Sequence, residues 1–440
     1  GAFPSAAAAW RLSEEGFMKD IDWLSNLKLR VSYGMTGNNA GVTDYATQQT
    51  VGGPDYYYFG GAWMQAFYPS GVVDTALSWE SSREINTGLD FGFFKNRISG
   101  SIDWYNKTAY DLLFDVKLPL EAGSNGSSPK QMATNVGIVN NRGLELALTT
   151  VNVETKDWRW ETSFTFATNK NTLLDINGTA EELPANLLFK GEPINVLYNY
   201  EWDGIISDRD MVVPDHEIAK LKGLTPGTTM PEYEYYYICY GQTEGQPKIV
   251  DRNGDGSYGD VDKKLYNRDP DWVGSFNTSL NYKNWDLSAS VYVRQGGYAS
   301  SAFMSEYLNF GDRGRTKLQV DHYIPAGTLI DCDGVNPDGT YINPVYQETT
   351  HYGSYPFPNN GAANSGIGIS MDYWPRAISE VSYVKVKNIT LGYTLPKNLL
   401  KKVGVERLRL YSTVMNPFVF TDFIGFDPEW AGANLKNDAP

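Results

Sequence analysis

Residues 251–262, DRNGDGSYGDVD, have the spacing of a calcium-binding loop. Ca²⁺ is a hard cation that takes oxygen ligands, and loops of this kind supply them from the first, third, fifth, seventh and last positions. In this chain those positions hold Asp251, Asn253, Asp255, Ser257 through its backbone carbonyl, and Asp262. Gly256 follows the third ligand, where the backbone must turn sharply. The spacing therefore predicts a calcium site with a structural role.

Two features of this loop depart from the usual pattern. No helix-forming sequence flanks it, so it is not an EF-hand pair, and Asp262 replaces the glutamate that normally closes the shell with both oxygens. Asp and Asn side chains also bond to nearby backbone groups in tight turns without any ion. The alternative is therefore a turn-rich loop that binds no metal.

Two aromatic clusters are candidate ligand-binding segments, DYYYFGGAW at 55–63 and YEYYYICY at 233–240. An aromatic ring presents an apolar face on which a sugar ring can stack. The candidate substrate-binding residues are Tyr56, Tyr57, Tyr58, Tyr235 and Tyr236. The alternative is that these tyrosines only pack within loops or in the interfacial girdle of a membrane barrel.

Little in the sequence indicates catalysis. None of the three histidines, His216, His322 and His351, stands in a zinc-protease motif or beside a serine elbow. We therefore expect no enzymatic activity. The two cysteines, Cys239 and Cys332, match no metal-ligand spacing, and they are either a disulfide or two unrelated loop residues.

These side chains need a scaffold, and residues 79–114 indicate which one. Apolar and polar residues alternate on either side of a turn at Lys95-Asn96, and the apolar face is predicted to hold Leu89, Phe91, Phe93, Ile102 and Trp104. Alternation over about ten residues is typical of a strand that crosses a bilayer between lipid and lumen. Strands of soluble proteins usually have about five or six residues. We expect the apolar face to contact lipid, where arginine would be costly, and expect arginine at Asp90 to be tolerated.

The same alternation recurs along the chain. It predicts further strands at residues 27–33, 144–149, 158–166, 276–282 and 287–293. In residues 384–395 the apolar phase slips at Asn388, as it does at a β-bulge. Weaker strand candidates lie near 194–206 and 233–240.

The connections between these strands are of two lengths. Short links fall at residues 95–96, 154–157 and 283–284, with a modest one at 396–404. Long polar links run over about 35–80, 107–142, 206–270 and 296–380. Outer-membrane barrels place short turns in the periplasm and long loops outside. We therefore expect the long links to be extracellular, and binding usually resides in such loops.

Composition agrees with a barrel. The chain has 440 residues, of which 14% are aromatic, including 30 Tyr and 12 Trp, and only 20% are charged. No run of roughly 20 apolar residues could form a transmembrane helix. In lipid only a helix or a closed barrel satisfies the backbone, so the predicted fold is all-β, a transmembrane antiparallel β-barrel. The net charge of −15 argues against a nucleic-acid partner.

Seven sequence blocks resemble one known family, in the same order as in that family. They are FPSAAAAWRLSEEGF, LKLRVSYGMTGNN, WESSREINTGLDFGFFKNRISGSIDWYNK, NVGIVNNRGLELAL, VDRNGDGSYGDVD, GSFNTSLNYKNWDLSASVYVRQGG, and the block running from YVKVKNITLGYTL to GFDPE. The family is that of SusC/RagA-type TonB-dependent outer-membrane transporters. The resemblance extends from residue 3 to about residue 430.

The resemblance implies a 22-stranded barrel closed by an N-terminal plug, a SusD-like surface lipoprotein that covers it, and energy supplied through TonB. We interpret residues 1–440 as the C-terminal part of such a barrel, without signal peptide, plug, TonB-contacting segment and last strand. The implied role is active import of an oligosaccharide, or less readily a peptide, across the bacterial outer membrane. The alternatives are a passive porin or adhesin-like barrel, and a soluble extracellular carbohydrate-binding β-protein.

Overall fold

The computed structural model describes most of the chain. The described residues are 2–40, 42, 44–69, 71–118, 124–125, 128–129, 131–176, 181–301, 321–357, 378–400, 404–423, 425 and 427–430. They form two compact units, the first comprising 1–196, 269–296 and 382–421, the second 197–268, 297–381 and 422–440.

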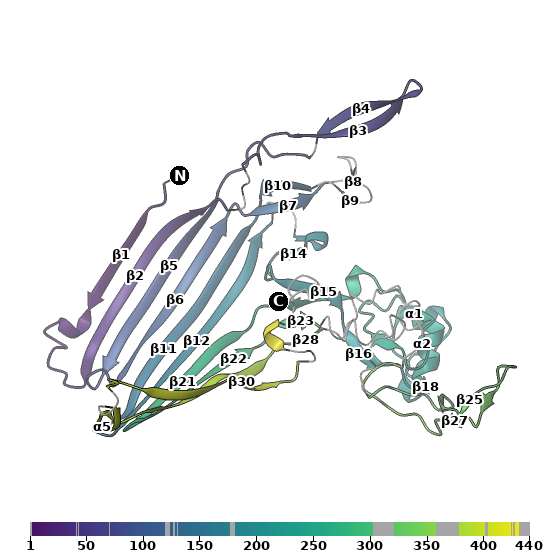
Figure 1. Ribbon diagram of the computed structural model, residues 1–440. Coiled ribbons are helices and arrows are strands. Elements are labelled where there is room, and N and C mark those ends of the chain that lie inside the picture. Colours follow the sequence, from purple (N-terminus) through teal and green to yellow (C-terminus); the bar gives the residue numbers. More distant parts are fainter. Residues whose placement is uncertain are drawn as a thin grey trace. The chain divides into compact units, whose positions relative to one another are not determined.

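The first unit is built on a ten-stranded antiparallel sheet (Figure 1). In spatial order its strands are β1 (Ser5–Arg11), β2 (Leu24–Asn38), β5 (Glu80–Phe93), β6 (Ile98–Tyr110), β11 (Ile138–Glu154), β12 (Trp158–Asp175), β21 (Trp272–Tyr282), β22 (Trp285–Gln295), β29 (Tyr383–Thr394) and β30 (Arg409–Thr421). Each strand pairs with the sheet strand before it in sequence, so the sheet is a simple meander. All the strands predicted by strong alternation are present.

Residues 79–114 form the predicted hairpin. The turn between β5 and β6 has positive φ at Phe94, Lys95 and Asn96, the conformation that tight hairpin turns require. Leu89 pairs with Ile102, and Phe93 pairs with Ile98. Because directly paired residues project from the same face of a sheet, the predicted apolar face is confirmed.

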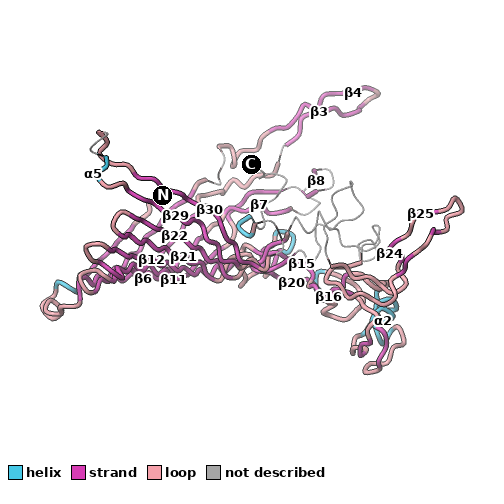
Figure 2. Tube along the Cα trace, turned by 60° about the horizontal axis from the view of Figure 1, so that its bottom comes forward, coloured by secondary structure: helices cyan, strands magenta, loops and turns pink. Residues whose placement is uncertain are grey.

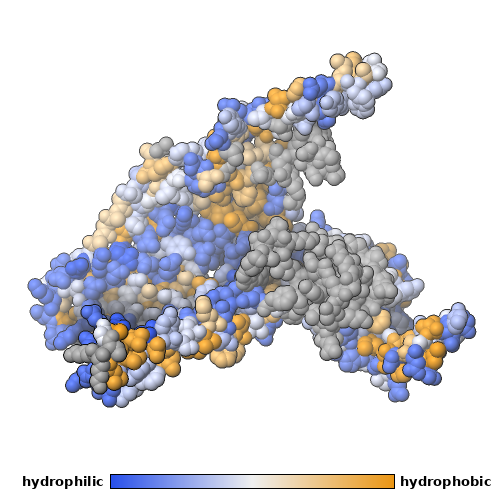
Figure 3. All heavy atoms as spheres, viewed as in Figure 1, coloured by the Kyte–Doolittle hydropathy of each residue, from blue (hydrophilic) through white to orange (hydrophobic). Residues whose placement is uncertain are grey.

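The two faces of the sheet differ sharply in chemistry. One face carries large apolar side chains that are exposed among the described residues; Trp104 is 44% exposed and Phe276 is 43% exposed. Hydrophilic residues cover much of the sheet face turned to the viewer in Figure 3. A soluble sandwich would cover its apolar face with a second sheet. The exposed apolar face therefore favours contact with lipid.

The polar face carries a charged cluster centred on Arg30. Its guanidinium donates to both oxygens of Asp90, at 2.9 and 2.8 Å, and pairs with Asp103 at 2.9 Å. Gly88 lies between Arg30 and Asp103 in the ladder, and a Cβ there would lie 2.6 Å from the Arg30 Nη2 atom. Arginine at Asp90 would place two guanidinium groups together, so this contact argues against the tolerance expected at that position.

The links alternate in length, as predicted (Figure 2). Short links join β5 to β6, β11 to β12 and β21 to β22, with longer turns after β1 and β29 that contain η1 (Leu12–Glu14) and α5 (Lys397–Leu400). The other four connections are long. A register shift between Val386 and Asn388 confirms the predicted bulge in β29.

Two of the long links remain in the first unit with the sheet. The link after β2 forms the hairpin β3 (Val51–Phe59) and β4 (Ala62–Pro69), and the link after β6 holds β7 (Leu113–Lys117), β8 (Ser124–Asn125), β9 (Ser128–Pro129) and β10 (Gln131–Asn135). The segment after β12 begins with β13 (Glu182–Leu183), η3 (Pro184–Asn186) and β14 (Leu188–Phe189). Val139, Leu173, Ile176 and Leu188 form a small core there.

The second unit is formed by the remainder of the links after β12 and β22 and by the described residues after β30. Its elements are β15 (Val196–Tyr200), β16 (Trp202–Ile205), β17 (Asp210–Val212), α1 (Glu217–Leu221), β18 (Thr229–Pro231), α2 (Glu232–Tyr240), β19 (Pro247–Ile249), η4 (Asp260–Asp262), β20 (Lys263–Asn267), β23 (Tyr298–Ser300), β24 (Leu329–Asp331), β25 (Gly334–Val335), β26 (Tyr341–Ile342), β27 (Val345–Tyr346), β28 (Ile378–Glu380) and η8 (Pro428–Trp430). Val213, Ile218, Ala219, Tyr235 and Cys239 form its core.

Two weaker strand predictions fare differently. Residues 194–206 contain the short strands β15 and β16, neither of which joins the ten-stranded sheet. Residues 233–240 lie in helix α2, so the strand predicted there is wrong. The helix ends at Gly241, whose φ of +69° is the left-handed conformation common after a helix C-terminus.

Replacing Phe91 by arginine tests which face meets lipid. Near the bilayer midplane it should cost about 2–4 kcal/mol of folding free energy. The matched control is Ser101→Arg, because Ser101 lies on the polar face opposite Asp90. Folding free energies of the intact parent protein in lipid vesicles would measure both. Equal costs for the two variants would contradict the assignment of faces.

Candidate functional site

The predicted calcium loop lies in the second unit between β19 and β20, and its first carboxylate is held from several sides. Asp251 accepts hydrogen bonds from the backbone N–H groups of Gly254 (2.6 Å) and Gly256 (2.9 Å) and from the Tyr240 hydroxyl (2.9 Å). Gly254 and Gly256 both have positive φ, which supplies the sharp turn expected at Gly256. The side chain of Asp251 therefore organises the loop by itself.

The other predicted ligands are also engaged within the loop. Asp262 is fully buried and accepts from the backbone N–H groups of Arg252 and Gly259. Asp255 accepts from the side-chain amide of Asn253 (2.8 Å) and from the backbone of Ser257 (2.7 Å). Among the described residues no three His, Cys, Asp or Glu side chains gather in a group that could hold a metal ion. Each predicted ligand side chain thus already has a hydrogen-bond partner within the loop or beside it. Calcium binding at this loop stays a prediction.

The aromatic candidates separate into two environments. Tyr56, Tyr57 and Tyr58 are 64%, 63% and 57% exposed on the hairpin β3–β4, where Tyr58 packs edge-to-face on Trp63. Tyr235 is only 1% exposed within the core of the second unit. A buried ring offers no face to a sugar, so the prediction that Tyr235 binds substrate is wrong.

Tyr236 joins a stack of tyrosines beside that core. It packs on Tyr240, which stacks on Tyr258 with ring centroids 5.5 Å apart. Burial raises the pKa of Tyr235 to about 12. Burial, together with the Tyr235 and Asp251 charges, raises the pKa of Tyr240 far above its ordinary value. This stack packs against the predicted calcium loop through the bond from Tyr240 to Asp251. Tyr236 therefore packs within the links, which was the alternative to binding substrate.

The two cysteines are not bridged. Cys239 is buried on α2 and Cys332 is half-buried after β24, and both are free thiols. Burial raises the pKa of the Cys239 thiol, which makes it a poor nucleophile.

The second unit contains a pocket that was not predicted from the sequence. An open cavity of about 570 Å³ is lined by residues that include Trp202, Arg209, Lys248, Tyr323 and Tyr352. Strands β16, β17 and β19, the start of α2 and the loop at 352–354 all contribute to it. No local motif marks it, because more than one long link supplies the wall.

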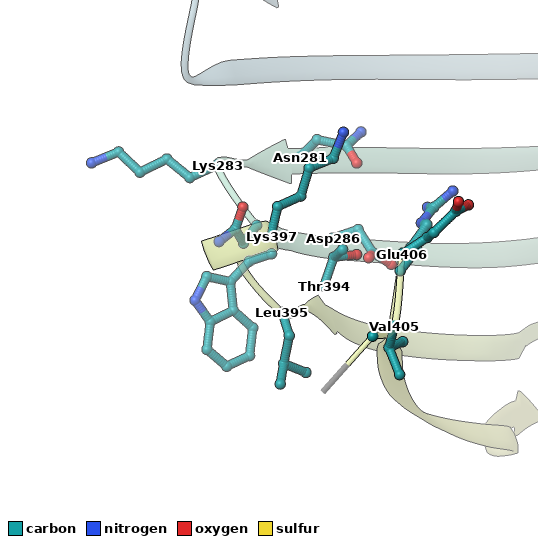
Figure 4. Close-up of a pocket in the computed structure, with 12 residues that line it drawn as sticks. Asn281, Lys283, Asp286, Thr394, Leu395, Lys397, Val405 and Glu406 are labelled. Atoms are coloured by element: carbon teal, nitrogen blue, oxygen red, sulfur yellow. The ribbon is translucent and has the colours of Figure 1, made fainter. Parts of the chain in front are cut away.

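A second hollow lies at the short-link end of the sheet (Figure 4). It measures about 990 Å³ and is formed by the β21–β22 turn, residues 394–397 and residues 404–407. Asn281, Lys283, Asp286, Lys397 and Glu406 are among the residues that line it. This end of the sheet is opposite to the end that carries the long links. We expect ligands to bind at the long links.

Comparison with known proteins identifies the family. The family model described as "TonB dependent receptor-like, beta-barrel" matches residues 1–416. The chain belongs to this TonB-dependent receptor family. It is 30% identical over 438 residues to the TonB-dependent receptor SusC of Bacteroides thetaiotaomicron, covering 98% of this chain and 38% of that protein. It is 28% identical over 448 residues to the TonB-dependent receptor P3 of Formosa agariphila, covering 99% of this chain and 39% of that protein.

The solved structures agree with this assignment at the level of fold. The structure of the RagAB peptide transporter matches with a TM-score of 0.68 at 22% identity, covering 98% of this chain and 41% of that one. The chain thus spans about two-fifths of the length of these relatives. The chain has the SusC/RagA-type TonB-dependent receptor barrel fold of the outer membrane, and we expect the apolar face of its sheet to meet lipid. No helix among the described residues is long and apolar enough to span a membrane.

Calcium binding can be tested on the intact parent protein. Asp251→Ala combined with Asp255→Ala should abolish a calcium site at this loop, because it removes two of the predicted carboxylate ligands. Asp255→Asn alone should weaken binding without disturbing Asp251, whose bonds shape the loop. The measurement is calcium stoichiometry by elemental analysis after dialysis, with Asp338→Asn, an exposed turn aspartate, as control. Unchanged stoichiometry in the double variant would place the ion elsewhere or exclude it.

Alkaline pH should loosen the second unit. In an unfolded chain tyrosines ionise near pH ~10, whereas the folded pKa of Tyr235 is about 12. The stability contributed by the buried phenols is therefore complete below the unfolded pKa and falls as pH rises toward the folded pKa. Protease sensitivity of the unit should rise together with phenolate absorbance, and Tyr240→Phe should reduce the alkaline loss. Early phenolate absorbance with no change in proteolysis would contradict the burial of these rings.

Proposed function

We propose that the parent protein imports oligosaccharides across the outer membrane with energy from TonB, together with a SusD-like surface lipoprotein. The observation that carries this proposal is the 30% identity to SusC over nearly the whole chain. The alternation of link lengths supports it, since every long link leaves the sheet at the same end. That end has the chain needed to build a binding surface, whereas the other end has only turns.

The proposed mechanism has three steps. Substrate is captured between the lipoprotein and the long links, the lipoprotein closes over it, and TonB then displaces a plug from the lumen. The residues described here contribute to the first two steps. The third step depends on the plug and on TonB.

Observations weigh against the other readings. A soluble carbohydrate-binding β-protein would bury its apolar face, and here that face is exposed along the sheet. A passive porin or adhesin-like barrel is disfavoured because the relatives are TonB-dependent receptors. Peptide import is the second candidate, because the structurally similar RagAB is a peptide transporter. The exposed tyrosines of the hairpin β3–β4 suit sugar rings but do not exclude peptides.

The lipoprotein should dock on an apolar arm in the long link after β22. This arm comprises residues 329–346 and is built from β24 to β27. Its exposed apolar side chains are Ile330, Val335, Tyr341, Ile342, Val345 and Tyr346. A small hairpin with so many exposed apolar groups is a typical protein-docking surface. It belongs to the long links that the proposed lipoprotein must cover.

Substitution of the arm tests the lipoprotein partner. Tyr341→Asp with Tyr346→Asp should reduce the amount of lipoprotein that co-purifies with the parent by about tenfold or more, since aromatic anchors dominate such interfaces. Barrel assembly, measured by resistance to unfolding in detergent, should stay intact. The control is Asn336→Asp with Thr340→Ser in the polar turn of the same arm. If co-purification and uptake both persist in the aromatic double variant, the arm is not the docking surface.

A further inference from the structure

The pocket in the second unit has a wall whose charged groups are partly committed to the fold. Lys248 donates to Glu232 at 3.0 Å and lies 3.3 Å from Asp203. The other oxygen of Glu232 accepts from the backbone N–H and hydroxyl of Ser207, at 2.9 and 2.8 Å. Glu232 and Lys248 are only 13% and 18% exposed. These groups hold the start of α2 in place and have little capacity left for a ligand.

Arg209 is held differently. Its guanidinium lies over the ring of Tyr352 at 4.0 Å from the centroid, and the described residues place no carboxylate within ion-pair distance of it. The Tyr352 hydroxyl donates to Asp208 at 2.5 Å, and Thr350 donates to the second oxygen of Asp208 at 2.6 Å. Tyr323, which also lines the pocket, packs edge-to-face on Tyr352. The guanidinium is therefore fixed in direction by the Tyr352 ring, and the Tyr352 hydroxyl is itself held by Asp208.

The remaining groups on the wall complement Arg209. Asp210 is exposed on β17 and lines the pocket beside it, and Trp202 supplies an apolar indole. Lys248 carries one charge against the two carboxylates of Glu232 and Asp203, so with Arg209 and Asp210 the wall has two cationic and three anionic side chains. An anionic ligand would gain from Arg209 but would be repelled by Asp210 and Asp203. A neutral sugar is not repelled by these carboxylates, because each hydroxyl can accept from a guanidinium and donate to a carboxylate.

We propose that this pocket binds one ring of a neutral oligosaccharide, with Trp202 against the apolar face of the sugar and Arg209 and Asp210 bonding to neighbouring hydroxyls. The volume of about 570 Å³ lies within the range of roughly 300–1,000 Å³ usual for small-molecule sites. This inference rests on the proposed function and adds to it a site and a substrate class. The site lies wholly within the second unit, so it does not depend on how that unit meets the sheet.

Binding to the full-length parent protein in detergent tests the site. The probes are neutral hexasaccharides of xylose, mannose or glucose, a hexamer of galacturonate, and an uncharged decapeptide, each measured by calorimetry. At least one neutral hexasaccharide should bind, and Trp202→Ala, Arg209→Ala and Arg209→Lys should each weaken it by about tenfold or more, because a bonded sugar hydroxyl is left unpaired or unstacked. Arg209→Lys keeps the charge of an exposed side chain, which protects the test against misfolding. The control is Arg159→Ala, an exposed arginine paired with Glu154 and Glu161 in the first unit.

The outcomes separate this inference from the proposed function. Galacturonate or peptide binding that depends on Arg209 would overturn the neutral-sugar assignment. Unchanged affinity in all three pocket variants, while the parent still imports the sugar, would overturn the site and leave the transport proposal standing. Failure of the parent to import any sugar, with pocket-dependent binding intact, would contradict transport and leave the site in place.

Discussion

The structure depends on one constraint, which is that lipid offers no hydrogen-bond partner to the backbone. Every N–H and C=O at membrane depth must then be paired by a neighbouring strand. The ten-stranded sheet meets this demand with continuous antiparallel ladders, as between β11 and β12, which pair from Ile138 to Glu154 with only two register shifts. A ladder of this kind fixes which side chains share a face. It also forces successive connections to opposite ends of the sheet, so that chain length can be concentrated at one end.

The same constraint directs charges to the lumen face, where they are paired across glycines. Arg30 and Asp103 flank Gly88, and Arg409 reaches Asp286 beside Gly392. In both places a Cβ on the glycine would clash with the guanidinium or the carboxylate. A charge-assisted pair that spans the strands also opposes slippage of the register, because a shift of one strand by one residue would move its charged group to the other face and separate the pair. The glycines at these two positions therefore help to fix the register of the strands.

The sheet was predictable from sequence, whereas the links were not, and the reason lies in the range of the interactions. Alternation between apolar and polar residues is local, so it revealed the strands, the turn at Lys95-Asn96 and the bulge at Asn388. Helix α2 was predicted as a strand because tyrosine favours strands, yet its first N–H groups bond to the carbonyls of Ser207 and Arg209. Such distant support is invisible in a local pattern. The pocket was missed for the same cause, since Trp202 and Tyr352 lie on different links.

The second unit has its own hydrophobic core, and its residues are separate from the ladders of the sheet. Tyr235 and Cys239 point into that core, so part of the aromatic content of the links stabilises the unit and the rest is left for ligands. None of these residues takes part in the ladders of the sheet. A substitution at Arg209 or Trp202 therefore changes the pocket wall without altering strand register, and a substitution in the ladder leaves the pocket chemistry untouched. Specificity and membrane insertion are thus carried by separate sets of residues, which allows one barrel design to serve different substrates.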